Sequence, residues 1–159
     1  MTYPDNEIQA VAFFTADHAA VENGKAYVNG GFWDRMQFPS FPAPASFAVV
    51  AVLNVPWHEY HKQHRFRIRI EDADGTPLPA EFNGDFQVGA APDMKVGQPT
   101  VMPIAGLVNG LPFERPGAYA FILDVDGRDL ARWTVNVTPV SVPGPSGPPG
   151  PASIPGLGG

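Results

Sequence analysis

Cysteine is absent from the 159-residue sequence, which excludes disulfides, thiolate metal sites and a cysteine nucleophile. Basic residues are scarce as well: 10 lysines and arginines against 16 aspartates and glutamates give a net charge of −6. Proteins that bind nucleic acid or anionic lipid neutralise phosphates with clustered basic side chains, so this composition argues against both partners. The longest strongly apolar run, residues 47–53, is far shorter than a membrane span, and residues 1–7 do not resemble a secretory signal. We therefore expect a soluble, cytoplasmic protein.

Helical periodicity is also missing, because no stretch of ten residues repeats apolar side chains every three or four positions. The 17 glycines and 19 prolines disfavour a helical bundle, since each costs a helix interior about 1 or 3 kcal/mol respectively. Apolar residues instead alternate with a period of two. In residues 65–70, arginines alternate with Phe66, Ile68 and Ile70, which predicts a strand with one buried face and one basic face in water.

The same alternation recurs along residues 1–139. Residues 119–125 and 133–137 repeat it, residues 7–15 and 46–55 are apolar on both faces as in central strands, and residues 27–32 and 80–88 are weaker strands. Residues 101–108 contain Pro103, which indicates an edge strand or a bend, and residues 16–22 are interpreted as a short connector. Dipeptides that close tight turns separate the strands: Asn23-Gly24, Asp74-Gly75, Asn83-Gly84, Asn109-Gly110 and Asp126-Gly127. About eight short strands predict an all-β fold, an antiparallel Greek-key β-sandwich or a squat barrel.

Composition changes near residue 140. We expect residues 1–139 to form the β-sandwich domain and residues 140–159, which carry no charge and little to bury, to form a disordered Pro/Gly-rich tail. Three glycines keep a three-residue period there, which is too short for a collagen helix. Two Pro-x-x-Pro spacings leave two interpretations open: an inert tail, or a segment that docks on a partner as a polyproline II helix.

Three histidines, His58, His61 and His64, stand three residues apart between two predicted strands. On a helical turn or a looping segment, three imidazoles at this spacing converge on one metal ion, whereas on a strand they point to opposite faces. Glu59 is the only carboxylate nearby to orient them, so the metal site is a weak prediction.

Catalytic motifs are missing from the sequence. Asp17 and His18 form a base with its orienting group, but no nucleophile accompanies them, and no serine lies in a Gly-x-Ser-x-Gly elbow. Phosphate-binding and dinucleotide-binding loops are absent too. Asp72 and Asp74 resemble the start of a calcium loop but lack the later ligands, so a hairpin turn is favoured. We expect a protein that is not an enzyme and needs no cofactor.

Aromatic residues are the remaining candidates for a binding surface. Phe32, Trp33, Phe38 and Phe41 lie among three prolines, so part of this segment must be a loop. Two interpretations stay open: the rings fold back over the end of the sandwich, or they form an exposed partner-binding patch. Trp57 and Tyr60 follow the next strand and are expected at the opposite end.

Several segments resemble a family of short bacterial proteins known only as a domain of unknown function. The resemblance rests on residues 12–19, 21–32, 38–39, 70–75 and 116–127, and it extends over most of residues 8–138. Each motif is a strand or a turn. The resemblance therefore implies a bacterial all-β domain of Greek-key type without an established activity, and it assigns no functional residue.

Three functions stay open at this point. The first is a non-enzymatic binding or accessory module that contacts an unidentified protein partner through the loops of a β-sandwich. The second is a structural subunit that self-associates into a homo-oligomer, as in a bacterial or phage-like assembly, which the sparse surface charge and the apolar residues 47–53 suit. The third, less favoured, is a histidine-rich metal-binding protein.

Overall fold

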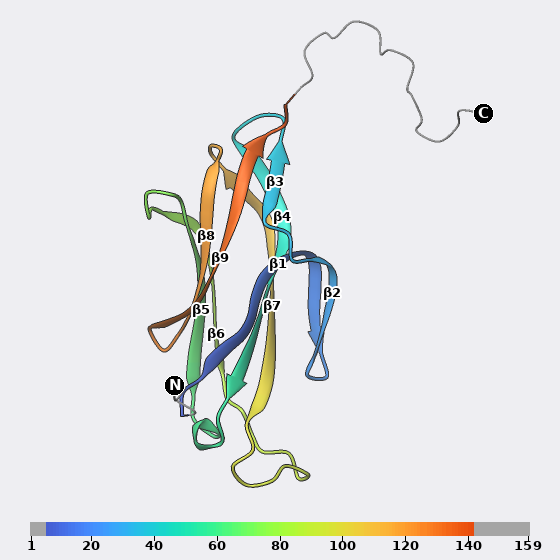
Figure 1. The fold of residues 1–159 in the computed structure, drawn as a ribbon, viewed down its shortest axis with the longest axis vertical. Coiled ribbons are helices and arrows are strands. Elements are labelled where there is room, and N and C mark those ends of the chain that lie inside the picture. The colour runs from blue at the N-terminus through green and yellow to red at the C-terminus, as the bar shows by residue number, and fades with distance from the viewer. Residues whose placement is uncertain (1–5, 142–159) are drawn as a thin grey trace, which may run out of the picture.

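In the computed structural model, which describes residues 6–141, two β-sheets lie face to face (Figure 1). This arrangement confirms the all-β prediction, and it is compatible with a Greek-key topology. The predicted tail of residues 140–159 lies outside the described residues from residue 142 onward. Nine strands and one 3₁₀ turn are present in residues 6–141: β1 (Gln9–Glu22), β2 (Lys25–Gly31), β3 (Arg35–Phe38), β4 (Ala43–Val55), η1 (Trp57–Glu59), β5 (His64–Glu71), β6 (Pro77–Phe86), β7 (Thr100–Phe113), β8 (Gly117–Val125) and β9 (Arg128–Pro139).

The first sheet has the strand order β2-β1-β4-β7, and the second has the order β3-β9-β8-β5-β6. β1 and β4 occupy central positions, as their apolar faces predict, and β7 with Pro103 is an edge strand. One pair departs from the antiparallel prediction, because β3 runs parallel to β9. The chain crosses from the first sheet to the second through residues 32–34, and it joins the edge of the second sheet in the direction of β9.

The main core fills the space between the two sheets. Side chains that alternate along β4, β5 and β8 meet there, and Leu53, Ile68, Ile70, Phe113 and Phe121 are fully buried. Burying one such side chain contributes about 1.5–3 kcal/mol, so this layer supplies much of the stability. Phe121 packs edge-on against Phe47 with their ring centroids 5.7 Å apart, which ties β8 to β4 across the sandwich.

Three of the five predicted turns are confirmed, and two are wrong. Asn83-Gly84 lies inside β6, where a Cβ on Gly84 would stand 2.7 Å from the Phe66 ring, so glycine makes room for that ring. Asn109-Gly110 lies inside β7 at a bulge, where the pairing with β4 shifts register and Gly110 has a φ of +65°. Both dipeptides therefore shape a strand instead of ending it.

Residues 16–22 continue β1 as a strand, so their interpretation as a connector is wrong. β1 pairs with β4 only as far as Ala16, and from there to Glu22 it pairs with β2. We call residues 16–31 the β1–β2 arm; its turn is Asn23-Gly24, whose φ angles are +51° and +72°. Figure 1 shows the arm standing beside the sandwich, and all seven residues of β2 are exposed.

A second, smaller core supports the base of the arm on the outer side of the first sheet. Its buried members are Phe14, Ala16, Ala19, Ala48 and Val50. The three alanines lack the bulk that would hold the arm away from the sheet. Among residues 6–141, no helix has the length and apolar character needed to cross a membrane.

Candidate functional site

Phe32, at the point where the chain leaves the arm, is the most unusual of the predicted binding residues. Its φ is +67°, a left-handed conformation that is rare for a bulky side chain. The ring remains 68% exposed and stacks on Phe14, with centroids 3.8 Å apart and an interplanar angle of 18°. Its backbone N–H donates to the Thr15 carbonyl over 2.9 Å. The structure thus holds a large aromatic ring in solvent at the cost of backbone strain.

A buried hydrogen-bond network fixes the chain immediately beyond Phe32. Thr15 is fully buried, and its hydroxyl donates to the Trp33 carbonyl over 2.7 Å. From β9, the Trp133 indole N–H donates to Thr15 Oγ1 over 3.0 Å and to the Trp33 carbonyl over 3.3 Å. One threonine therefore joins β1, the crossing segment and β9, and it determines where Phe32 emerges.

The other three aromatic residues of this segment fold back onto the main core. Trp33 packs edge-on against Phe47 at 5.9 Å, and Phe38 contacts both Phe41 and Phe113 at 6.1 and 6.3 Å. The structure therefore favours the fold-back interpretation for Trp33, Phe38 and Phe41, and the exposed-patch interpretation for Phe32 alone. An open pocket of about 490 Å³ lies beside these rings, lined partly by Trp33, Phe38 and Phe47.

Trp57 begins η1 and Tyr60 directly follows it, and this turn lies at the end of the sandwich opposite β3 (Figure 1). Tyr60 is buried and donates its hydroxyl to the Gln98 carbonyl over 3.0 Å, and burial raises its pKa above the ordinary value. The Trp57 ring is tilted against Tyr60 at 5.1 Å and lines a pocket of about 530 Å³ with Glu7, Asn54 and His58 among its walls. Tyr60 thus packs in the core, and Trp57 keeps an outward side.

The three histidines take different positions. His58 points to the Asn6 carbonyl and lies 3.4 Å from Glu59. His64 is buried and lies 3.3 Å from the other oxygen of Glu59. His61 has a φ of +63° and its backbone N–H donates to Val88. Within residues 6–141, no three histidine, aspartate or glutamate side chains are arranged to hold a metal ion.

His64 connects the loop after η1 to the hairpin between β8 and β9. Its Nδ1 lies 2.7 Å from Asp126 Oδ2, and the other carboxylate oxygen accepts the Arg65 backbone N–H over 2.9 Å. Burial alone would raise the pKa of Asp126, but these hydrogen bonds from His64 and Arg65 outweigh it and lower the pKa. These contacts join the start of β5 to the β8–β9 hairpin at one end of the sandwich.

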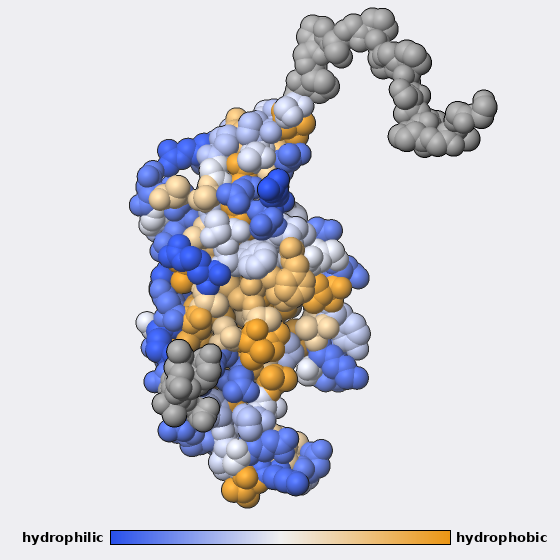
Figure 2. Space-filling view, in the orientation of Figure 1, coloured by the Kyte–Doolittle hydropathy of each residue, from blue (hydrophilic) through white to orange (hydrophobic). Residues whose placement is uncertain are grey.

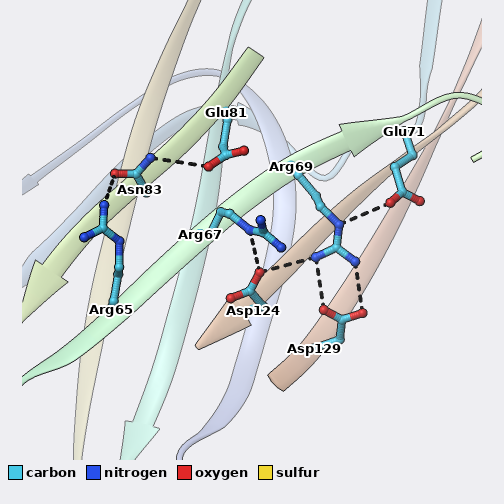
Figure 3. Close-up of polar contacts among 8 residues, drawn as sticks. All are labelled: Arg65, Arg67, Arg69, Glu71, Glu81, Asn83, Asp124 and Asp129. Atoms are coloured by element: carbon cyan, nitrogen blue, oxygen red, sulfur yellow. Dashed lines mark hydrogen bonds and ion pairs between the residues drawn. The ribbon is translucent and has the colours of Figure 1, made fainter. Parts of the chain in front are cut away.

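The arginine face of β5 is paired with acidic side chains, as Figure 3 shows. Asp124 on β8 is buried and accepts hydrogen bonds from Arg67 Nε at 2.8 Å and from Arg69 Nη1 at 3.3 Å. Arg69 also makes two bonds to Asp129, at 3.0 and 3.1 Å, and one to Glu71 at 3.2 Å. The hydrogen bond to Asp129 raises the pKa of Arg69, which keeps the guanidinium charged. The predicted face is therefore only partly in water, and acids on β8, β9 and β5 itself neutralise its basic charge at Arg67 and Arg69.

Asp72 and Asp17, which the sequence offered as candidates for chemistry, take part in local structure. Asp72 caps the β5–β6 turn by accepting the backbone N–H groups of Asp74 and Thr76, both over 2.9 Å, which confirms the hairpin interpretation. Those bonds lower the pKa of Asp72. Asp17 leans over Gly30 on the neighbouring strand, whereas His18, the next residue on β1, points to the other face. Asp17 and His18 therefore do not act as a base and its orienting group.

The β1–β2 arm is a candidate surface that was not predicted from the sequence. The signal was the Asn23-Gly24 turn, flanked by Val21 on one side and by Tyr27 and Val28 on the other. These three residues are 39%, 54% and 36% exposed. A strand exposed along its whole length cannot be distinguished from a half-buried strand by apolar alternation alone.

A comparison with models of protein families places most of the chain in a family. A family model described as a family of unknown function (DUF6941) matches residues 11–138, which agrees with the resemblance inferred from the sequence. No curated protein matches the sequence significantly.

Proposed function

The chain belongs to this family of unknown function, and from its exposed surface we propose that it is a non-enzymatic binding module that recognises a protein through the β1–β2 arm and Phe32. The site lies on the long side of the sandwich and not in the loops at its ends. The cytoplasm is its proposed location.

The conformation of Phe32 is the observation that carries this proposal. A left-handed conformation costs a non-glycine residue about 1–2 kcal/mol, and exposing the ring forgoes the gain from its burial. Strained residues of this kind gather at functional sites, where the surrounding structure holds them in place. Here the stack on Phe14 and the bond to Thr15 hold the ring. Docking a partner on Phe32 would bury the ring.

Exposed apolar side chains are concentrated on the segment that contains the arm, with Tyr27 and Val28 on its two faces. Within residues 6–141, nine large hydrophobic residues are exposed, and five of them lie between residues 11 and 32: Val11, Val21, Tyr27, Val28 and Phe32. Figure 2 shows the main apolar area of this view at mid-height, next to the base of the arm. Apolar patches of this kind mark interaction sites in monomeric proteins. The second candidate function, a self-associating structural subunit, is favoured by the free edge of β2.

Photo-crosslinking in an extract of the native cells tests the proposal. A photoreactive phenylalanine analogue is placed at Tyr27, and a matched chain carries it at Val96, which is 87% exposed at a distant loop. We expect discrete adducts from position 27 and none from position 96. Phe32→Asn should abolish those adducts without unfolding the chain, because asparagine tolerates a positive φ. Equal labelling from both positions, or adducts with a different protein that survive Phe32→Asn, would contradict the proposal.

A further inference from the structure

β2 presents an unpaired hydrogen-bonding edge. Glu22 and Lys25 flank the two-residue turn, and residues in that position exchange both backbone hydrogen bonds. Because antiparallel pairs alternate, residues 25, 27 and 29 direct their N–H and C=O groups toward β1. Ala26 and Val28 direct theirs away from it, whereas the φ of +61° at Gly30 interrupts the alternation. β2 is the last strand of its sheet, and within residues 6–141 no other segment donates to or accepts from Ala26 and Val28.

This edge lacks the features that usually prevent strand pairing. Proline and bulges are absent between Lys25 and Asn29, and the register with β1 is continuous from Val28 to Lys25. Lys25, at the end of the strand, is its only charged residue. In addition, a two-stranded hairpin is marginally stable in water, whereas three or more strands form a stable sheet. The arm therefore has free backbone hydrogen-bonding groups, and pairing with another strand would stabilise it.

We propose that the occupant of this edge is β2 of a second copy of the chain, paired antiparallel about a two-fold axis at Val28. This inference goes beyond the proposed function, because the pairing uses the edge of β2 and leaves Phe32 outside the paired residues. In this register Val28 exchanges both backbone hydrogen bonds with Val28 of the second copy. Ala26 then lies opposite Gly30 of the second copy on either side of this central pair. The two arms then form one four-stranded sheet, β1-β2-β2-β1.

In this register, the side chains of β2 in one copy fit those of β2 in the second copy. Val28 meets Val28 of the second copy on one face, and Tyr27 lies opposite Asn29 on the other. Lys25 is the only charged residue of β2, so no like charges of β2 face one another across the two-fold axis. A two-fold axis uses each contact twice, as the self-complementary interfaces of symmetric dimers do.

A single introduced cysteine tests the register directly, because the chain has none of its own. Residues in a hydrogen-bonded antiparallel pair have Cα atoms about 5.5 Å apart, within the range that a disulfide spans. The purified full-length Val28→Cys chain should therefore form a disulfide dimer of twice 17.0 kDa. It should form faster than in Tyr27→Cys, or in Val101→Cys, where the residue is 59% exposed on β7. Equal rates in all three chains, or faster pairing of Tyr27→Cys, would overturn the proposal.

Proline at the same position gives the second readout. The Val28 N–H points away from β1, so Val28→Pro removes one bond donor from each copy and leaves the ladder of the arm intact. Sedimentation should show the wild-type chain as a dimer, and Val28→Pro should weaken dimerisation roughly tenfold or more. A monomeric wild-type chain would overturn the dimer alone. The proposed function is tested separately: it fails if the photoreactive analogue at position 27 also crosslinks to no protein in the cell extract.

Discussion

Removal of the Thr15 hydroxyl should destabilise the fold well beyond what one surface contact contributes. Thr15→Val keeps the shape and the β-branch of the side chain, so the perturbation is confined to one oxygen. That oxygen donates to the Trp33 carbonyl and accepts from the Trp133 indole. In the variant the indole keeps only its 3.3 Å bond to Trp33.

The magnitude follows from the complete burial of Thr15. Each ordinary hydrogen bond contributes about 0.5–1.5 kcal/mol net, and a buried group left poorly paired costs about 1–3 kcal/mol. We therefore expect a loss of about 2 kcal/mol in the free energy of unfolding. For a chain of this size, that loss lowers the melting temperature by roughly 4–8 °C.

Urea unfolding of four chains measures the effect: wild type, Thr15→Val, Trp133→Phe and the double variant. Because the two residues share a bond, Thr15→Val should cost about 1 kcal/mol less in the Trp133→Phe background. Thr134→Val is the matched control, since Thr134 is exposed on β9, and it should change stability by less than about 0.5 kcal/mol. Additive single effects, or a Thr15→Val chain as stable as wild type, would refute this account of the network.

Three other perturbations have defined outcomes. Asp124→Ala should lower the free energy of unfolding by about 1–3 kcal/mol, because it removes the buried carboxylate that Arg67 and Arg69 share; an unchanged denaturation midpoint would contradict this. The pKa of Asp126 is lower in the folded state, so its contribution is present above its ordinary pKa of 3.8 and is lost as the pH falls through the lowered value. Asp126→Asn should therefore flatten the decline in stability below about pH 4, as followed by urea midpoints at each pH. Gly30→Ala should destabilise the arm, because the residue has a φ of +61° and its Cβ would collide with Asp17; faster amide exchange in residues 25–31 would report this.

The sequence predicted the layers of the fold better than the ends of its strands. Period-two alternation identified β5, β8 and β9 because one face of each is buried, and Pro103 identified an edge. The alternation could not distinguish Asn83-Gly84 in β6 from the turn at Asp126-Gly127. The difference depends on the Phe66 ring, which belongs to a neighbouring strand. Turn chemistry is local, whereas the space that a glycine must leave free is a tertiary property.

The candidate surface was predicted only in part. Phe32 was identified as one aromatic residue of a proline-rich segment, but composition could not separate it from Trp33, Phe38 and Phe41. That separation arises from the crossing between the sheets, where a positive φ turns one ring outward and leaves the next three to pack on the core. The arginine face shows the opposite case. The arginines themselves were identified from the sequence. The acidic residues of β8 and β9 that pair with Arg69 lie 55 to 60 positions further along the chain.

The crossing segment also gives the molecule an optical reporter of its own. Phe32 and Trp33 are consecutive, and the carbonyl of Trp33 lies within hydrogen-bonding distance of the Trp133 indole N–H. A partner that shifts the Phe32 ring therefore acts on a backbone to which a partly buried chromophore is bonded. Indole emission responds to such a change in hydrogen bonding, so occupancy of the arm can be followed by intrinsic fluorescence without attaching a dye.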